Sequence, residues 1–145
     1  MNIYLMWFIN LNNFTTYMNK GSWEKMISTH RKKCEKIISF STNIRYVGVF
    51  NEYGRTISGK IRSDIKPIFS SNEVREEFFT IASIMKLREK SSKTLGEIEF
   101  MTISHKKINI LLFYKNGITY YVTISSKIIP PLILTNKIKK IIIQE

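Results

Sequence analysis

The chain has 145 residues, of which 43% are hydrophobic, 12% aromatic and 23% charged. This composition excludes wholesale disorder, and the length suits one domain with a single core. There are 23 basic and 11 acidic residues, which gives a formal net charge of +12. The single cysteine, Cys34, excludes an internal disulfide framework and a thiolate zinc cluster, and it favours a cytoplasmic setting.

Residues 1–21 form an N-terminal extension that we place outside the folded domain, which we assign to residues 22–145. The apolar run at 3–9 is too short to span a bilayer. It also lacks the preceding basic residues and the small-residue cleavage site of a signal peptide. Two explanations stay open: Met18 is the physiological start, or the run packs on a protein surface. We expect no membrane association.

Residues 22–39 are predicted to form a helix capped by Ser22. One stripe with a 3.6-residue period carries its apolar and semi-polar residues: Trp23, Ile27, His30, Cys34, Ile37 and Ile38. The helix also carries a basic group: Arg31, Lys32, Lys33 and Lys36.

A strand is predicted at 44–50, followed by a turn at Asn51–Gly54 and a second strand at 55–62. The first strand is apolar on both faces, with Ile44, Tyr46 and Phe50 on one and Val47 and Val49 on the other. A strand of this kind is covered on both sides. Gly48 and Gly59 lie inside the strands, where glycine often permits a close backbone approach.

The next helix begins with a capping box, in which Ser70 is the cap and Glu73 reaches back. Its main apolar stripe consists of Val74, Phe78, Ile81, Ala82 and Met85. Phe79 lies to one side of this stripe, and Ile84 and Leu87 lie to the other. This arc is wider than contact with one sheet requires, so we expect something else to cover part of it.

Three further strands are predicted at 98–104, 108–114 and 118–124, with an Asn116-Gly117 pair typical of a tight hairpin between the last two. Glu97 and Glu99 indicate that the first of these strands is a partly wet edge. A final amphipathic helix is predicted near 134–142. The order α-β-β-α-β-β-β-α predicts an α+β fold, with a five-stranded antiparallel sheet and helices on both faces.

This order resembles the roadblock/LC7 family, within the wider profilin- and longin-like group, and also small archaeal proteins of the same shape. Three segments carry the resemblance, which covers residues 22–145 in pattern: IRYVGVFNEYGRTISGK, ASIMKLREKSSKTLGEIEF and INILLFYKNGITYYVTI. The family's members are binding modules without catalytic residues. They pair through the second helix and the edge third strand, and several act as scaffolds or regulators of small Ras-like GTPases or motor complexes.

The resemblance therefore implies a homodimer with no cofactor and a small GTPase or another protein as partner. The implied dimer interface is Phe79, Ser83, Ile84, Leu87 and Phe100. The basic first helix and the N-terminal extension depart from the family pattern.

No constellation of residues predicts chemistry, and we expect no catalytic, cofactor-binding or metal-binding residues. Residues 54–60 spell G-x-x-x-x-G-K, but Ile61 follows instead of Ser or Thr, and the glycines flank a strand. His30 and Cys34 lie one helical turn apart, yet two ligands are too few for zinc. We interpret both as structural residues of the core stripe.

Two alternatives remain beside the interaction module. The basic groups on the first helix and at 60–66, 86–93 and 137–140 are compatible with nucleic-acid binding. Tyr120 and Tyr121 would then be candidates for stacking on bases, but the predicted helices cover them. A solvated basic surface is the simpler interpretation. The other alternative is a small-ligand sensor, which requires a pocket between the sheet and a helix.

Overall fold

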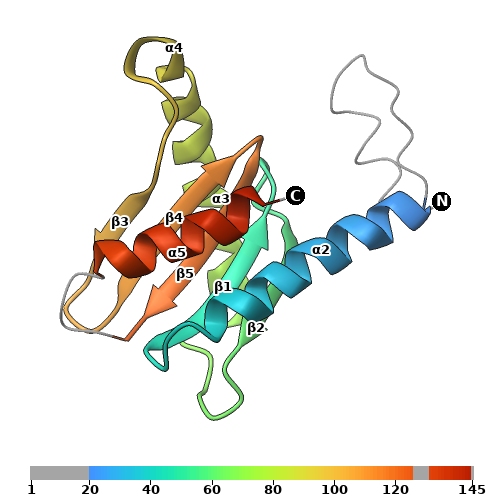
Figure 1. The fold of residues 1–145 in the computed structure, drawn as a ribbon, viewed down its shortest axis with the longest axis vertical. Coiled ribbons are helices and arrows are strands. Elements are labelled where there is room, and N and C mark those ends of the chain that lie inside the picture. The colour runs from blue at the N-terminus through green and yellow to red at the C-terminus, as the bar shows by residue number, and fades with distance from the viewer. Residues whose placement is uncertain (1–19, 126–130, 145) are drawn as a thin grey trace.

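The computed structural model describes residues 20–125 and 131–144, and it has the predicted α+β architecture (Figure 1). Its elements are α2 (Lys20–Ile38), β1 (Ile44–Phe50), β2 (Thr56–Ile61), α3 (Ser71–Glu89), α4 (Ser92–Leu95), β3 (Met101–Ser104), β4 (Asn109–Lys115), β5 (Ile118–Ile124) and α5 (Leu132–Ile143). The strands form one antiparallel sheet in the order β2-β1-β5-β4-β3. Residues 1–19 of the predicted extension lie outside the described residues, and its last two residues, 20 and 21, belong to α2.

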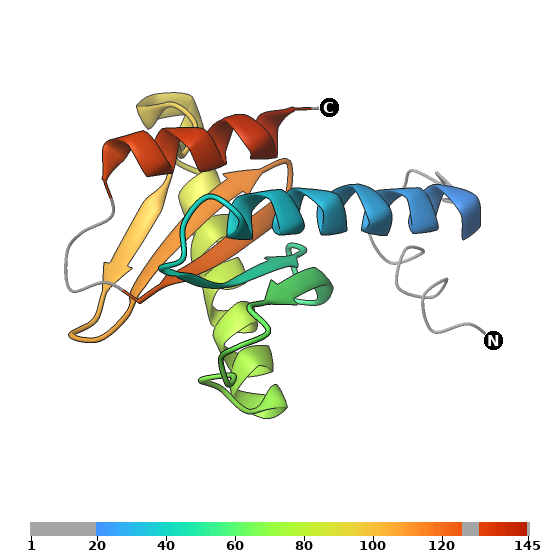
Figure 2. The same ribbon diagram turned by 60° about the horizontal axis from the view of Figure 1, so that its bottom comes forward.

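The helices form two layers, one on each side of the sheet. α2 and α5 lie on one face, here called the α2/α5 face, and α3 crosses the other, the α3 face (Figures 1 and 2). The core of the α2/α5 face includes Cys34, Val47 and Ile138, whereas that of the α3 face includes Phe78 and Leu112. Helices cover both faces of the sheet because strands such as β1 and β4 are apolar on both sides.

Element ends differ from the sequence predictions at a few places. α2 already includes Lys20, so Ser22 lies within the helix and is not its cap. β3 starts at Met101, three residues later than predicted, because it pairs with β4 only from Met101 opposite Leu112 to Ser104 opposite Asn109. The capping box of α3 is present: the Ser70 hydroxyl accepts from the Glu73 amide at 3.3 Å, and the Glu73 carboxylate accepts from the Ser70 amide at 2.8 Å.

A bulge in β1 corrects the predicted alternation of its side chains. The register with β5 shifts between Ile44 and Tyr46, so Arg45 is the extra residue. Ile44 consequently packs with Val47 on the α2/α5 face instead of with Tyr46. Bulges commonly re-aim a side chain in this way, and here the side chain turned to the α3 face is that of Arg45.

Two glycines of the β1–β2 hairpin are required by their surroundings. Gly54 has φ +76°, and a Cβ there would come within 2.6 Å of the Phe79 Cα on α3. The hairpin turn therefore packs directly on the helix backbone. A Cβ on Gly48 would lie 2.6 Å from the Tyr46 hydroxyl, so the expected close approach is made by a side chain and not by a backbone.

Candidate functional site

The outward face of α3 carries large apolar side chains in contact with solvent. Phe79 and Leu87 are each 62% exposed. The helix points them outward because its inward stripe, which includes Phe78 and Met85, already seals the sheet. At 100° per residue, Phe79 cannot share the direction of Phe78.

The other predicted interface residues differ from one another in exposure and in the element that carries them. Ser83 is exposed, and its hydroxyl donates to the Phe79 carbonyl oxygen at 2.9 Å. Ile84 is half-buried and packs against the core of the α3 face. Phe100 is 40% exposed and lies immediately before β3. The structure therefore places three of the five residues on the outward side of α3, one at its margin, and one beside the edge strand.

β3 forms one edge of the sheet. It has four residues and pairs with β4 on one side, and the part of the chain that the structure describes supplies no strand on its other side. Such an edge presents unpaired backbone donors and acceptors that a further strand can meet. The edge predicted from Glu97 and Glu99 is confirmed in position, although both glutamates precede the strand.

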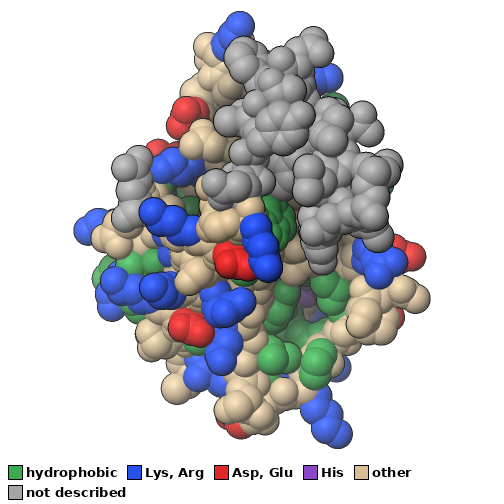
Figure 3. Space-filling view, turned by 90° about the vertical axis from the view of Figure 1, so that its right-hand side faces the viewer, with side chains coloured by type: hydrophobic (Ala, Val, Ile, Leu, Met, Phe, Trp, Pro, Cys, Tyr) green, Lys and Arg blue, Asp and Glu red, His purple; other side chains and the backbone are tan. Residues whose placement is uncertain are grey.

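The basic residues on α2 differ in exposure: three of the four are exposed to solvent, and one is half-buried and bonded to α5. Arg31, Lys32 and Lys36 are exposed. Lys33 is half-buried, and its Nζ donates to the Ile142 carbonyl oxygen at 2.9 Å in the last turn of α5. A cation at this position satisfies a terminal carbonyl and complements the helix dipole. On the face shown in Figure 3, most of the visible Lys and Arg side chains lie on the left half and centre, interspersed with acidic and uncharged residues.

Arg62, a member of the basic group at 60–66, is a structural residue. Its guanidinium donates to the carbonyl oxygens of Ile38 and Ser41, both at 2.7 Å, and to that of Ile44 at 2.9 Å. These bonds tie the end of α2 to the start of β1. The charge of Arg62 is thus used within the chain and is not presented to a polyanion.

Cys34 belongs to the core, and His30 is half-buried beside it, as predicted. His30 Nδ1 lies 2.5 Å from the Tyr120 hydroxyl, and burial together with Lys33 lowers the pKa of His30 below its usual 6.5. Cys34 is fully buried, and burial, with Glu35 as the smaller cause, raises the pKa of its thiol to about 12. A protonated, inaccessible thiol is neither a nucleophile nor a metal ligand. Among the described residues, no three His, Cys, Asp or Glu side chains are grouped to hold a metal ion.

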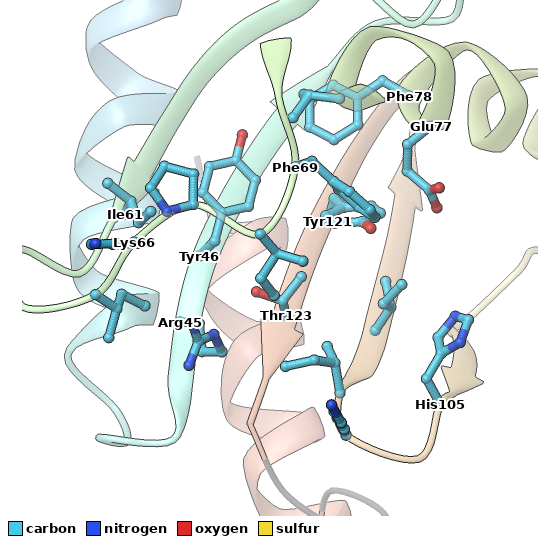
Figure 4. A pocket seen from close by; sticks show the side chains of 17 residues that line it. Arg45, Tyr46, Ile61, Lys66, Phe69, Glu77, Phe78, His105, Tyr121 and Thr123 are labelled. Atoms are coloured by element: carbon cyan, nitrogen blue, oxygen red, sulfur yellow. The ribbon is translucent and has the colours of Figure 1, made fainter. Parts of the chain in front are cut away.

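A cavity of about 460 Å³ lies on the α3 face, and the sequence analysis did not locate it. Its walls come from the strands β1, β4 and β5, the end of β2, the first turns of α3, the β2–α3 loop and the β3–β4 turn. Figure 4 shows Phe78 and Glu77 of α3 at one end and Arg45 of β1 toward the other. One feature of the sequence pointed to a cavity. Both faces of β5 are covered, yet one of them carries the hydroxyl groups of Thr119, Tyr121 and Thr123.

No helix within the described ranges combines the length and the apolar character that crossing a membrane requires.

No family model matches the chain, and no curated protein matches it by sequence. Solved structures do match its fold. The Roadblock/LC7 domain from Streptomyces avermitilis aligns with a TM-score of 0.60 at 6% identity, over 77% of this chain and 90% of that one. The gliding protein MglB from Thermus thermophilus gives 0.61 at 11% identity, over 79% and 86%. MglB with a tetrameric arrangement gives 0.62 at 13% identity, over 84% and 85%. The chain thus has the Roadblock/LC7 fold, as its element order indicated, and these identities establish the fold alone.

Proposed function

We propose that this chain is a non-enzymatic interaction module that forms a homodimer and acts as a scaffold or regulator. The observation that carries the proposal is the outward face of α3, where Phe79 and Leu87 are each 62% exposed on a helix whose inward stripe is already buried. Exposed apolar side chains gathered on one face are typical of protein-binding surfaces. A second copy of α3 would bury them.

The edge strand and the fold support the same assembly. The resemblance implies pairing through the second helix and the third strand, which correspond to α3 and β3 here. β3 is the edge strand, and Phe100 precedes it directly. One of the similar structures shows MglB in a tetrameric arrangement. Antiparallel addition of a second β3 would continue the sheet across two copies.

Light scattering of the full chain tests the pairing. We expect a dimer at tens of micromolar, and we expect Phe79→Glu and Leu87→Glu each to give a soluble, folded monomer, because a carboxylate buried at the interface costs several kcal/mol. A wild-type chain that remains a strict monomer at that concentration would refute the homodimer. Unfolding of both variants would show that the helix face is sealed within one chain.

Leu132→Glu is the matched control. Leu132 lies at the start of α5, on the opposite face of the sheet, and is 64% exposed, so the substitution adds the same charge at a position of similar exposure. We expect this variant to stay dimeric. If it dissociates and Leu87→Glu does not, the interface lies on α5.

The partner that the resemblance implies is a small Ras-like GTPase. A pull-down with the wild-type chain, compared with the Phe79→Glu monomer as bait, separates partners that require the dimer from those that do not. We expect a GTPase among the dimer-dependent partners. Recovery of nucleic acid alone, lost when the salt is raised from about 50 to 200 mM, would instead support the electrostatic alternative.

A further inference from the structure

The cavity on the α3 face contains three polar atoms that have no hydrogen-bond partner among the described residues. They are the Tyr121 hydroxyl, the Thr123 hydroxyl and Nε of Arg45, and all three residues line the cavity. Tyr121 and Thr123 are 1% and 5% exposed. Leaving a buried donor unpaired is costly, and native proteins do so rarely, so each such group calls for an explanation.

Arg45 and Thr123 lie side by side. β1 pairs with β5 at Tyr46 opposite Thr123, and Arg45 is the bulged residue next to that pair. Without the bulge, alternation would direct the Arg45 side chain to the opposite face of the sheet, under α2 and α5. The bulge therefore brings a guanidinium beside a buried hydroxyl at the cavity wall (Figure 4).

The charges around the cavity favour an anion. Three permanent cations line it, Arg45, Lys66 and Lys107, against one carboxylate, Glu77. Arg45 Nε can only donate a hydrogen bond, and both hydroxyls can donate. Burial, and after it the charge of the Glu77 carboxylate and hydrogen bonding to it, raises the pKa of Tyr121, so the phenol keeps its proton. Arg45 Nε and the Thr123 hydroxyl are therefore the two unpaired groups that carry the argument. Unpaired hydrogen-bond donors that lie near an excess of positive charge suit a ligand group that is negatively charged and only accepts hydrogen bonds, such as a carboxylate.

The rest of the cavity is apolar. Tyr46, Phe69 and Phe78 contribute aromatic walls, and Ile108 and Ile110 of the β4 side contribute aliphatic ones. The volume of about 460 Å³ lies within the range of small-molecule sites. A mostly apolar cavity with a few polar groups is the usual form of such sites.

We propose that this cavity binds a small carboxylic acid with an apolar body. The carboxylate lies against Arg45 and Thr123, and the apolar body extends beneath α3 and the β2–α3 loop past Phe69 and Ile110. Tyr121, two residues from Thr123 on the same face of β5, donates a further hydrogen bond to the ligand. Lys107 and His105, both exposed in the β3–β4 turn, border the mouth.

This site does not depend on the homodimer. It uses the inner side of α3, with Phe78 and Glu77, whereas the proposed dimer uses the outer side, with Phe79 and Leu87. Either proposal can fail while the other stands.

Three probes added to the full-length chain test the chemistry: decanoate, acetate and decylammonium. We expect saturable binding of decanoate only, measured by calorimetry, with amide shifts in isotope-labelled protein concentrated at 108–110 and 121–123. Acetate lacks the apolar body, and decylammonium carries the opposite charge. The proposal is refuted if decanoate does not saturate, if decylammonium binds as tightly, or if the shifts map to another part of the chain.

Substitutions localise the carboxylate. Arg45→Gln should weaken decanoate binding roughly tenfold, which is the scale of one charge-assisted contact. Lys107→Gln should weaken it by a smaller factor. Its neighbour Lys106 is also exposed in the turn but does not line the cavity, so Lys106→Gln is the matched control and should leave binding unchanged. Equal weakening by Arg45→Gln and Lys106→Gln would reveal attraction to net charge alone and overturn the site.

Thr123→Val covers the case in which Arg45→Gln does not fold. The substitution keeps the shape of the side chain and removes only the unpaired hydroxyl. We expect weaker decanoate binding together with an unchanged or higher melting temperature. A fall in the melting temperature with unchanged decanoate binding would show that the hydroxyl stabilises the fold and does not bind the ligand.

Discussion

The two faces of the sheet differ in whether their buried tyrosine hydroxyls have hydrogen-bond partners. Two neighbouring residues, Tyr120 and Tyr121, illustrate the difference. Tyr120, 2% exposed, lies on the α2/α5 face, where its hydroxyl is 2.5 Å from His30 Nδ1. Tyr121, 1% exposed, lies on the α3 face, where its hydroxyl has no hydrogen-bond partner among the described residues. Their burial is nearly equal, so exposure to water does not explain the difference.

Within the described residues, the two faces differ in how many helices cover them, and we relate the contrast to that difference. Two helices, α2 and α5, cover one face, and their polar side chains reach inward or across, as His30 and Lys33 do. On the other face, α3 is the helix that the described part of the chain supplies, and the β2–α3 loop covers the sheet beside it. We interpret the α2/α5 face as the more completely covered one, and the α3 face as the one that leaves buried polar groups unpaired beside a cavity.

The largest expected effect comes from deleting core volume on each face. Ile138→Ala, at a fully buried position of α5, should lower the free energy of unfolding by about 2–5 kcal/mol. Ile110→Ala should cost less, near the lower end of that range, because Ile110 already borders a cavity. Urea denaturation of both variants checks the order. A larger loss for Ile110→Ala would contradict the view that the α3 face is the less tightly packed one.

The tyrosine pair gives the next largest contrast. Tyr120→Phe leaves His30 Nδ1 without its partner and should cost about 1–2 kcal/mol. The Tyr121 hydroxyl has no hydrogen-bond partner of suitable geometry among the described residues and has only the Glu77 carboxylate nearby, so Tyr121→Phe should cost less than Tyr120→Phe or be neutral. Denaturation midpoints of the two variants, measured side by side without added ligand, test this difference. Equal destabilisation would show that both hydroxyls are paired in the folded protein.

A pH dependence should arise on the α2/α5 face, from His30. Burial lowers the pKa of His30 from 6.5, so the unfolded chain binds a proton more readily than the folded one. The contribution of neutral His30 to stability is therefore complete above pH 6.5 and is lost as the pH falls toward the lowered pKa. Melting temperatures between about pH 8 and pH 5 should show this loss in the wild type and a smaller one in His30→Gln. An identical slope in the variant would assign the loss to other groups.

The smallest expected effect separates two adjacent lysines of the basic group. Lys33→Gln removes the cation that meets the Ile142 carbonyl of α5 and should cost about 0.3–1 kcal/mol. Lys32→Gln, on the exposed side of the same turn, should change stability by less than about 0.5 kcal/mol. Thermal unfolding at low salt resolves the pair. Matching losses would place both lysines in solvent.

Elements whose signals are local could be predicted from the amino-acid sequence. The capping box at Ser70 and Glu73, the hairpin at Asn116-Gly117 and the apolar stripe of α3 each depend on residues only a few positions apart. The same patterns led to the correct fold class, because strands that are apolar on both sides require helices on both sides. The exposed Phe79 and Leu87 followed from the same helical period, since one inward stripe cannot include every apolar residue.

The cavity and the residues that line it could not be predicted in this way, because they depend on contacts between distant parts of the chain. Arg45 reaches the α3 face through a bulge, and that bulge exists because β1 pairs with β5, a strand from the far end of the chain. Thr123 and Tyr121 showed a polar pattern in the sequence, but their missing partners depend on where α3 and the β2–α3 loop lie above them. Local spacing cannot specify such long-range placement, because each strand's neighbours are fixed by packing that involves the whole chain.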